Sequence, residues 1–382
     1  MAKSADLFIC GDVINQTTDK QFIDLSLIDI IQHCDYSICN FEGTCKSNAL
    51  QDGQMLQRES TLQSLKDAGF NMLLLANNHI TDYGDRGLRQ TITSIEQYGF
   101  DRIGAGFDYY EVYRPHILNI NGLKIGIINI CEAQLGQFKE KEQPYGYAWL
   151  GDYGLDERIR TLRNEVDYLI VIPHAGLESY SIPLKQFRYL YQHWCDLGVD
   201  VVVGGHPHIV QGIEKYSNSI IFYSLGNFFF TGFNGEIDSW TKGISCVLHF
   251  SEESISYDVI QHEMNDECVT AVYTDINEIE AKNCILASEE LYRNALKEQN
   301  AIAFDAVPMR LYMSALNGTS SHDSFVTKIK KIIFYLLNRK SLYVGSEMYR
   351  MSVLKRLTEN ETYRYLTISA LEEQLGEKYK RL

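Results

Sequence analysis

The stretch DVVVGGHPH, residues 200–208, contains a short run of β-branched residues that ends in two glycines and two histidines. Short β-branched runs bounded by turn residues are typical of buried strands. In open α/β sheets, the polar residues that follow the carboxyl ends of strands form the functional sites. This strand end therefore predicts a fold class and a candidate site together.

Five earlier runs repeat the pattern of a short apolar strand closed by turn or polar residues. They are residues 6–11, 35–41, 71–76, 124–131 and 167–173. Helical spacing occurs next to several of them, at residues 62–68, 88–98 and 184–197. Strands that alternate with helices predict a largely parallel sheet covered by helices, which is an α/β architecture.

The pattern changes toward the end of the chain. Residues 223–227 and 243–250 predict strands with no helix between them, so we expect part of the architecture to be antiparallel. After about residue 265 helical spacing takes over, at residues 276–299 and 346–357. We therefore predict an α/β domain over residues 1–265 and a mainly helical region of unknown role over residues 266–382.

Charge also separates the two parts of the chain, whose overall net charge is −15. Residues 1–280 hold 19 basic and 39 acidic side chains, a net charge of −20, whereas residues 281–382 hold 16 and 11, a net charge of +5. The acidic part argues against nucleic acid as a partner, because phosphate binding needs clustered Lys and Arg.

The basic region contains six apolar residues, IIFYLL, flanked on both sides by Lys and Arg within residues 328–340. A core helix whose lysines extend to solvent is the favoured interpretation. The alternative is an interfacial helix that contacts a membrane.

Several features indicate the compartment. No run reaches the ~18 apolar residues needed to span a bilayer, and no secretory signal is visible at the start. None of the nine cysteines forms a Cys-x-x-Cys pair, which favours reduced, buried thiols. We expect a cytoplasmic protein, with peripheral membrane contact as the further option.

Metal-binding residue types follow nearly every strand of the first part. In chain order they are Asp12, Asn40, Glu42, Asn77, Asn78, His79, Asp82, His174, Glu178, His206 and His208. Each alone has an ordinary explanation as a helix cap, a turn former or a hydrogen-bonded histidine. Five such strand ends in one domain favour a metal site, since helix caps do not need histidine. Mixed imidazole, carboxylate and amide ligands suit Mn, Fe or Zn better than Ca.

Six ordered motifs resemble the bacterial capsule synthesis protein CapA family. They are GDV (11–13), NFE (40–42), NNH (77–79) with Asp82 and Gly84, HAGLE (174–178), GHPH (205–208) and YSLGNF (223–228). That family is named for poly-gamma-glutamate capsule biosynthesis and belongs to the calcineurin-like metallophosphoesterase superfamily. The resemblance covers roughly residues 5–262 and implies a four-layer αββα sandwich with a two-metal centre on its loops.

The resemblance also implies roles for the matching residues. The metal ligands would be Asp12, Glu42, Asn78, His174, His206 and His208, with Glu42 bridging two ions. His79 matches the histidine that contacts the leaving group or the phosphoryl oxygens, and Asp82 would orient it. Asn40, Glu178 and Asn227 would shape the substrate pocket, although the turn around Asn227 has a purely structural interpretation as well.

One position departs from the superfamily pattern. Ile14 stands where many phosphoesterases have the histidine of an Asp-x-His motif. One metal site is thereby left with Asp12, Glu42 and His208, so occupancy by one ion and by two ions both stay open.

The implied chemistry is hydrolysis. Two cations about 3.5–4 Å apart can activate a bridging water as a nucleophile at neutral pH. We predict a metal-dependent hydrolase of capsule or exopolymer metabolism that acts on a small-molecule or polymer substrate, either a phosphoester or a gamma-glutamyl amide of polyglutamate. The alternative is a non-catalytic accessory protein of a membrane-associated capsule-assembly complex, with a structural or degenerate metal site. Ile14 and the basic region favour the alternative, whereas His79, which does not resemble a ligand, favours the enzyme.

Overall fold

The computed structural model describes residues 3–45, 55–134, 136–232, 238–272, 277–317 and 347–375. The chain divides into two compact units, residues 1–292 and residues 293–382, and each is described by itself. The division predicted at residue 265 stays a prediction. The basic-flanked segment at 328–340 lies outside the described residues.

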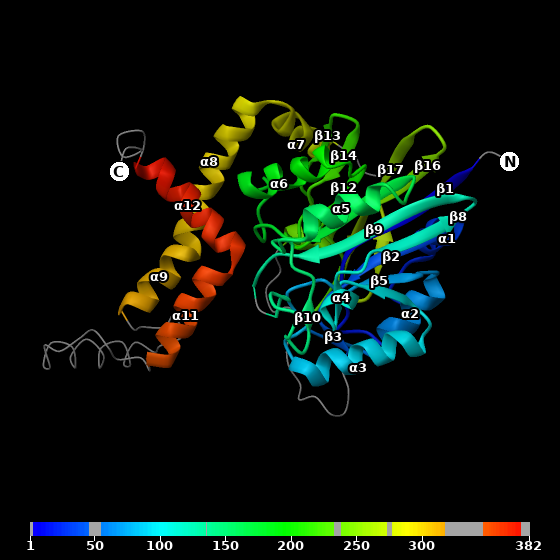
Figure 1. The fold of residues 1–382 in the computed structure, drawn as a ribbon, viewed down its shortest axis with the longest axis horizontal. Coiled ribbons are helices and arrows are strands. Elements are labelled where there is room, and N and C mark those ends of the chain that lie inside the picture. Colours follow the sequence, from blue (N-terminus) through cyan, green and yellow to red (C-terminus); the bar gives the residue numbers. More distant parts are fainter. Residues whose placement is uncertain are drawn as a thin grey trace, which may run out of the picture. The chain divides into compact units, whose positions relative to one another are not determined.

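The first unit contains a mixed sheet in the order β18-β17-β16-β1-β2-β5-β6, with β15 also paired to β1 (Figure 1). Its strands are β1 (Ser4–Ile14), β2 (Tyr36–Phe41), β5 (Met72–Leu74), β6 (Asp101–Ile103), β15 (Asn227–Phe230), β16 (Lys242–Ser251), β17 (Ile255–Met264) and β18 (Val269–Ala271). β1 pairs in parallel with β2 and β15 and antiparallel with β16. The expected antiparallel part therefore lies beside β1.

A second sheet has the order β13-β14-β12-β11-β9-β8. Its strands are β8 (His116–Ile120), β9 (Leu123–Cys131), β11 (Tyr168–His174), β12 (Val201–Val203), β13 (Ile213–Tyr216) and β14 (Ser219–Phe222). The four central strands are parallel, and the edge strands β8 and β13 pair antiparallel. Two short pairs complete the strands, β3 (Thr44–Cys45) with β4 (Leu56–Gln57) and β7 (Ala105–Gly106) with β10 (Gly146–Tyr147).

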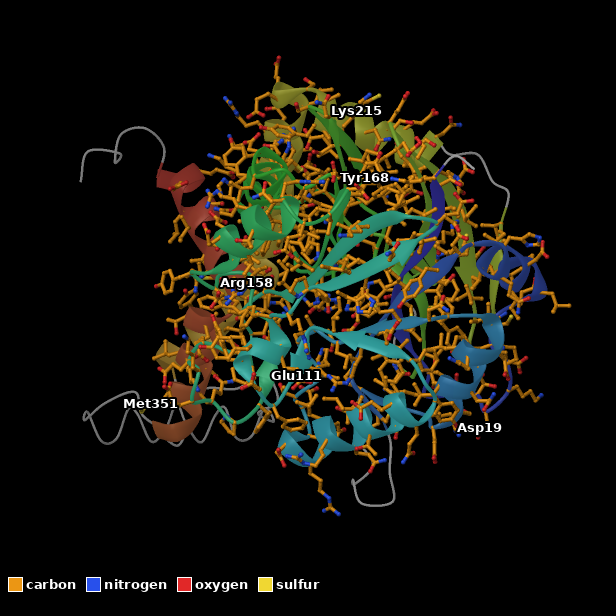
Figure 2. The ribbon with its side chains drawn as sticks, turned by 45° about the vertical axis from the view of Figure 1, so that its right-hand side comes forward. Asp19, Glu111, Arg158, Tyr168, Lys215 and Met351 are labelled. Atoms are coloured by element: carbon orange, nitrogen blue, oxygen red, sulfur yellow. The ribbon has the colours of Figure 1, made fainter. Side chains whose placement is uncertain are left out.

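Alternation along β1 shows how the layers stack. Phe8 and Cys10 face a core shared with the helices that cover the first sheet, whereas Leu7 and Ile9 face a core shared with the second sheet. The helices of the unit are α1 (Leu25–His33), α2 (Ser60–Ala68), α3 (Gly84–Gln97), α4 (Tyr109–Val112), α5 (Leu155–Arg163), α6 (Lys185–Asp196) and α7 (Asn277–Ala287). The first three cover one sheet, α5 and α6 contact the other, and side chains fill the space between (Figures 1 and 2). This arrangement confirms the predicted four-layer αββα fold.

The strand predicted at residues 223–227 is wrong. β14 ends at Phe222 in the second sheet and β15 begins at Asn227 in the first. Between them Gly226 adopts a left-handed φ of 71°, a conformation that glycine accepts without steric cost. The apolar residues of this stretch therefore belong to the segment that connects the second sheet to the first.

Among the residues that the structure describes after β18, the fold is mainly helical, as predicted. The described helices are α8 (Glu289–Ala306), α9 (Pro308–Asn317), α11 (Glu347–Glu359) and α12 (Glu361–Leu375). The single helix expected at 276–299 is divided into α7 and α8 at Ser288, whose hydroxyl accepts the backbone N–H of Leu291 as a helix cap does. No helix within the described ranges is both long and apolar enough to cross a membrane.

Helix α7 is attached to the loop that follows β12. Lys282 donates from Nζ to the carbonyl of Val210 at 2.8 Å, and Asn283 accepts the backbone N–H of Ile213 at 2.6 Å. Arg188 on α6 donates to the carbonyl of Leu286 at 2.8 Å. These bonds tie the end of the 204–213 loop to a helix far along the chain.

His262 on β17 predicts acid sensitivity of the first sheet. The ring is 1% exposed and lies 5.1 Å from the Phe228 ring, and burial lowers the pKa of His262 to about 4. Its stabilising contribution is complete above about pH 6.5, its unfolded value, and is lost as the pH falls toward 4. We expect the free energy of unfolding to fall by about 1.4 kcal/mol per pH unit from this group.

Urea unfolding of chelator-treated wild type and of His262→Phe, at pH 6.5 and 5.5, measures this contribution. The wild type should lose about 1 kcal/mol more than the variant over that unit, because the unfolded ring is already half protonated at pH 6.5. Equal losses would contradict the assignment of the acid sensitivity to His262.

Candidate metal centre

Strand ends from both sheets meet at one place in the first unit. Asp12 lies in β1, Glu42 follows β2, and His174 ends β11. His206 and His208 lie in the loop after β12, whose residue Gly205 forms a bridge with His174. The side chains of all five are buried. The carboxyl ends of parallel strands thus bring together residues that are almost two hundred positions apart.

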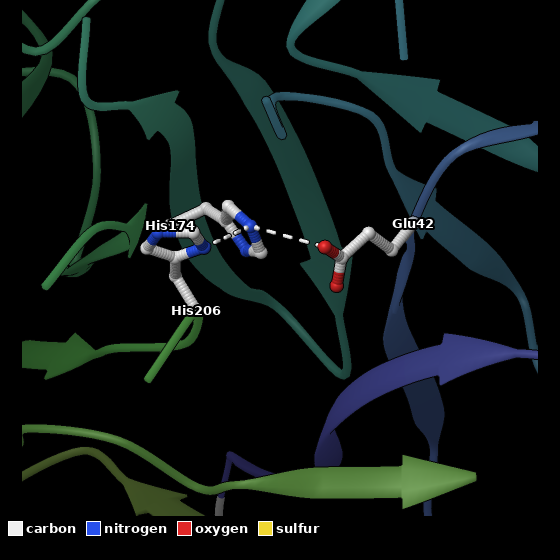
Figure 3. A group of neighbouring side chains, drawn as sticks. All are labelled: Glu42, His174 and His206. Atoms are coloured by element: carbon white, nitrogen blue, oxygen red, sulfur yellow. Dashed lines mark hydrogen bonds and ion pairs between the residues drawn. The ribbon is translucent and has the colours of Figure 1, made fainter. Parts of the chain in front are cut away.

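The first group of ligand atoms is centred on His174. Its Nε2 lies 3.1 Å from His206 Nδ1 and 3.7 Å from Glu42 Oε1 (Figure 3). The same nitrogen lies 3.0 Å from Asn78 Oδ1. Octahedral ligands at about 2.1 Å from an ion stand about 3.0 Å from their neighbours. These separations therefore suit donors that surround a single divalent cation.

The second group consists of Asp12, Glu42 and His208. His208 Nδ1 lies 3.3 Å from Asp12 Oδ2, and Glu42 belongs to the first group as well. Ile14 is fully buried in the apolar core of the first sheet and supplies no imidazole. The structure therefore brings together the three residues that remain as ligands when Ile14 replaces the histidine of the Asp-x-His motif.

Glu42 provides the test of whether the site fits a cation. It is fully buried, yet within the described residues neither of its carboxylate oxygens accepts a hydrogen bond. Burying a carboxylate without such partners costs several kcal/mol. Burial, followed by repulsion from Asp12, raises the pKa of Glu42 well above its ordinary value. A cation would satisfy both oxygens, so the residues present fit a divalent metal.

The histidines divide by their electrostatic surroundings. Burial lowers the pKa of His174, and burial with the neighbouring His174 lowers that of His206 further, so both rings are neutral near pH 7, as ligation requires. For His208 burial acts the same way, but the charge of Glu42 and the bond to Asp12 outweigh it and raise the pKa to about 9. Burial likewise opposes ionisation of Asp12, and hydrogen bonds from His174 and His208 overcome it and hold its pKa far below the usual range.

The loop that carries His206 and His208 is strained. His206 has a φ of 92° and His208 a φ of 59°, in the left-handed region that costs residues other than glycine about 1–3 kcal/mol each. The backbones of β1 and of the turn at Gly226 also lie very close together, since a Cβ on Gly11 would lie 1.8 Å from the Gly226 carbonyl oxygen. Strain of this kind collects at functional sites, and here the strained loop supplies one imidazole to each of the two ligand groups.

His79 and Asp82 form a pair at the edge of this site. His79 Nδ1 lies 2.7 Å from Asp82 Oδ2, and both side chains remain about one third exposed. His79 lies near enough to contribute to the lowered pKa values of His174 and His206. The predicted orienting contact is therefore present, and the ring keeps access to solvent.

The three residues predicted to shape a substrate pocket lie at the site in different surroundings. Asn40 donates to Asp12 Oδ1 at 2.7 Å, and Asn227 is fully buried with its Oδ1 2.9 Å from His208 Nδ1. The side chain of Glu178 is half exposed, 3.7 Å from His206 Nε2. Their roles in substrate binding stay predictions, and the two asparagines contact metal-ligand candidates directly.

Sequence reasoning missed Glu132 and Gln134. Glu132 follows β9, is fully buried, and places Oε1 3.7 Å from His206 Nε2. Gln134 Nε2 lies 3.1 Å from the same nitrogen, and Gln134 Oε1 accepts a hydrogen bond from Asn78. The available signal was the same one used elsewhere, since residues 124–131 had been predicted as a strand and Glu132 comes next.

Trp240 also escaped prediction. It lies in the short 3₁₀ helix Asp238–Thr241, with its ring 4.5 Å from that of His208. Its Nε1 donates to Ser179 Oγ at 2.9 Å, and its carbonyl accepts from Asn227. The Trp240 ring therefore flanks the second group of ligands.

Comparison with curated proteins finds several relatives of this chain. The chain is 33% identical over 243 residues to the capsule biosynthesis protein CapA of Bacillus anthracis, covering 60% of this chain and 57% of the relative. It is 30% identical over 219 residues to the PGA biosynthesis protein CapA of Bacillus subtilis, covering 56% of each. A probable polyglutamine synthesis accessory protein of Mycobacterium tuberculosis is 26% identical, over 40% of this chain and 43% of its own length. The matched region thus spans little more than half of the first two relatives.

Among solved structures, the chain is similar to a 5'-nucleotidase precursor from Thermus thermophilus, with a TM-score of 0.43 and 14% sequence identity over 81% of this chain and 60% of that one. The model of one protein family matches residues 6–232, which is more than half of the chain and includes every candidate ligand named above. The chain belongs to the bacterial capsule synthesis protein family PGA_cap, the CapA family that its motifs resemble.

Proposed function

We propose that this protein is a metal-dependent hydrolase that acts on a phosphoester or a gamma-glutamyl amide in the metabolism of a capsule polymer. The carrying observation is Glu42, a buried carboxylate with unsatisfied oxygens that two groups of ligand atoms share. Membership of the family and the names of the two Bacillus relatives support polyglutamate as the polymer.

The proposed ligands form two sets. Asn78, His174 and His206 with Glu42 would hold one ion, and Asp12 and His208 with Glu42 would hold the other. The imidazole, carboxylate and amide donors favour Mn, Fe or Zn. When bound, such ions lower the pKa of a coordinated water toward neutrality and polarise the bond to be cleaved.

The chain's own residues would complete the reaction around those ions. His79 would act as the proton donor in its doubly protonated form, with the Nδ1 proton donated to Asp82 at 2.7 Å and the second proton, on Nε2, passed to the leaving group. Asn40 would keep Asp12 oriented through the bond to its Oδ1. Half-exposed Glu178 would face the incoming substrate.

A second candidate function is a non-catalytic accessory protein of a capsule-assembly complex. Ile14, which leaves one ligand set with three residues, and the printed name of the mycobacterial relative favour it. In either case we propose the cytoplasm as the compartment, because none of the nine cysteines belongs to a Cys-x-x-Cys pair, which favours thiols that stay reduced there. Contact with a membrane or an assembly partner through the basic C-terminal region remains part of this proposal.

Metal analysis of the purified protein tests the proposed site. We expect about two transition ions per chain in the wild type and their loss in Asp12→Ala and His174→Ala, since each replacement removes a direct ligand. Assays with Mn²⁺ on a phosphodiester and on poly-gamma-glutamate then separate the two substrate classes. Ions retained by both variants would refute the ligand assignment.

A further inference from the structure

We propose that Glu132 and Gln134 are positioning residues that orient His206 and Asn78 toward the ion they share. This inference rests on the proposed function, because it concerns the ligand set of Glu42, Asn78, His174 and His206. Neither residue is itself placed as a ligand. Both follow β9 of the second sheet, in a segment of the sequence that contains none of the proposed ligands.

The orientation of Asn78 depends on Gln134. Asn78 donates from Nδ2 to Gln134 Oε1 at 3.2 Å, while its Oδ1 lies 3.0 Å from His174 Nε2. An amide binds a cation through its oxygen and not through its nitrogen. By engaging the nitrogen, Gln134 leaves the oxygen directed at the other ligand atoms.

The orientation of His206 depends on Gln134, which Glu132 holds in place. His206 directs Nδ1 at the ligand group, 3.1 Å from His174 Nε2, and its other ring nitrogen, Nε2, lies 3.1 Å from Gln134 Nε2. The carboxylates of Glu132 and Glu178 lie farther from His206 Nε2, each at 3.7 Å, which is beyond hydrogen-bond range. Glu178 has a half-exposed side chain, whereas that of Glu132 is fully buried.

Glu132 is also held in place. Its Oε1 accepts from Gln134 Nε2 at 2.9 Å and its Oε2 accepts from the backbone N–H of Gly176 at 3.3 Å. The buried hydroxyl of Tyr147 links the two backbones, donating to the Glu132 carbonyl at 3.0 Å and accepting from the Gln134 N–H at 3.1 Å. The rigid Glu132 carboxylate therefore fixes the side chain of Gln134, which contacts both Asn78 and His206, and outer residues of this kind orient the ligands of a metal.

Three variants separate this role from mere packing. We expect Glu132→Gln, which keeps an acceptor oxygen but loses the charge, to weaken binding of one Mn²⁺ about 10-fold, and Glu132→Leu and Gln134→Leu to weaken it about 100-fold. Titrations of the full chain followed by calorimetry measure these constants. Glu111→Gln is the matched control. Glu111, on α4 (Figure 2), is a partly buried carboxylate that pairs with Arg102 at a distance of 2.9 Å.

Co²⁺ absorption supplies a readout that packing alone would not move. We expect the visible bands of the Co²⁺-loaded protein to change in the Glu132 and Gln134 variants and to stay as in the wild type in Glu111→Gln, because the bands report ligand geometry. Unchanged metal affinity and spectra in folded Glu132→Leu would overturn this inference and leave the proposed function intact. A wild type that binds no metal would instead overturn the proposed function itself.

Discussion

Replacing Glu42 with glutamine is expected to abolish binding of both ions and at the same time to stabilise the metal-free protein. Glu42 belongs to both ligand groups, so its loss disturbs two sites at once. Removing an outer carboxylate costs about 10–100-fold in metal affinity, and the loss of a shared direct ligand should exceed about 100-fold.

The gain in stability follows from the burial of Glu42. Within the described residues its oxygens accept no hydrogen bond, and neighbouring Asp12 repels its charge. A neutral side chain of the same shape removes this repulsion, and we expect the free energy of unfolding to rise by about 1–2 kcal/mol.

Denaturation with and without Mn²⁺ checks both halves of this prediction. In chelator the variant should unfold at higher urea concentration than the wild type, and Mn²⁺ should stabilise the wild type alone. Asp82→Asn serves as the control, since Asp82 pairs with His79 outside both ligand groups. A Glu42→Gln protein that is less stable than the wild type in chelator, or that still binds two ions, would contradict the assignment.

Replacing His79 with alanine is expected to reduce turnover about 10²–10⁴-fold while the metal content stays at the wild-type value. Positioned proton donors contribute about this factor, and His79 belongs to neither of the two groups of candidate ligand atoms. Asp82→Asn should lower turnover in the same direction, because it removes the carboxylate that accepts the Nδ1 proton of His79.

The rate is to be measured on whichever of the two substrate classes the wild type cleaves, together with bound metal and the melting temperature. A fall in rate with unchanged metal and melting temperature supports the enzyme. A wild type that binds two ions but cleaves neither a phosphodiester nor polyglutamate would favour the accessory protein instead. Full activity in His79→Ala would remove this residue from the mechanism.

Much of the fold was predictable because its signals are local. The apolar runs that end at Asp12, His174 and Gly204 predict strands without knowledge of their neighbours, and each proved to be one. The stretch at 223–227 failed since two strands of different sheets follow each other there with only a short crossing around a left-handed glycine between them. Composition does not reveal which sheet a strand joins.

The candidate site shows the same limit. The residue types that bind metals could be named from the sequence, but the groups they form depend on which strands are neighbours. Glu132 reaches the site because β9 pairs with β11, which places Glu132 next to His174 and the loop at Gly176. Asn40 and Asn227 were predicted to bind substrate, which stays a prediction, and their contacts with Asp12 and His208 are visible only in three dimensions.

The attachment of α7 to the 204–213 loop affects how this family can recombine with other domains. The segment that matches the family stops at residue 232, whereas Lys282 and Asn283, which brace the end of the histidine loop, come about fifty residues later. A gene fusion that exchanged everything downstream of the matching segment would keep all the candidate ligands and discard their brace. A chimaera built from this chain should therefore be joined after α7 rather than before it.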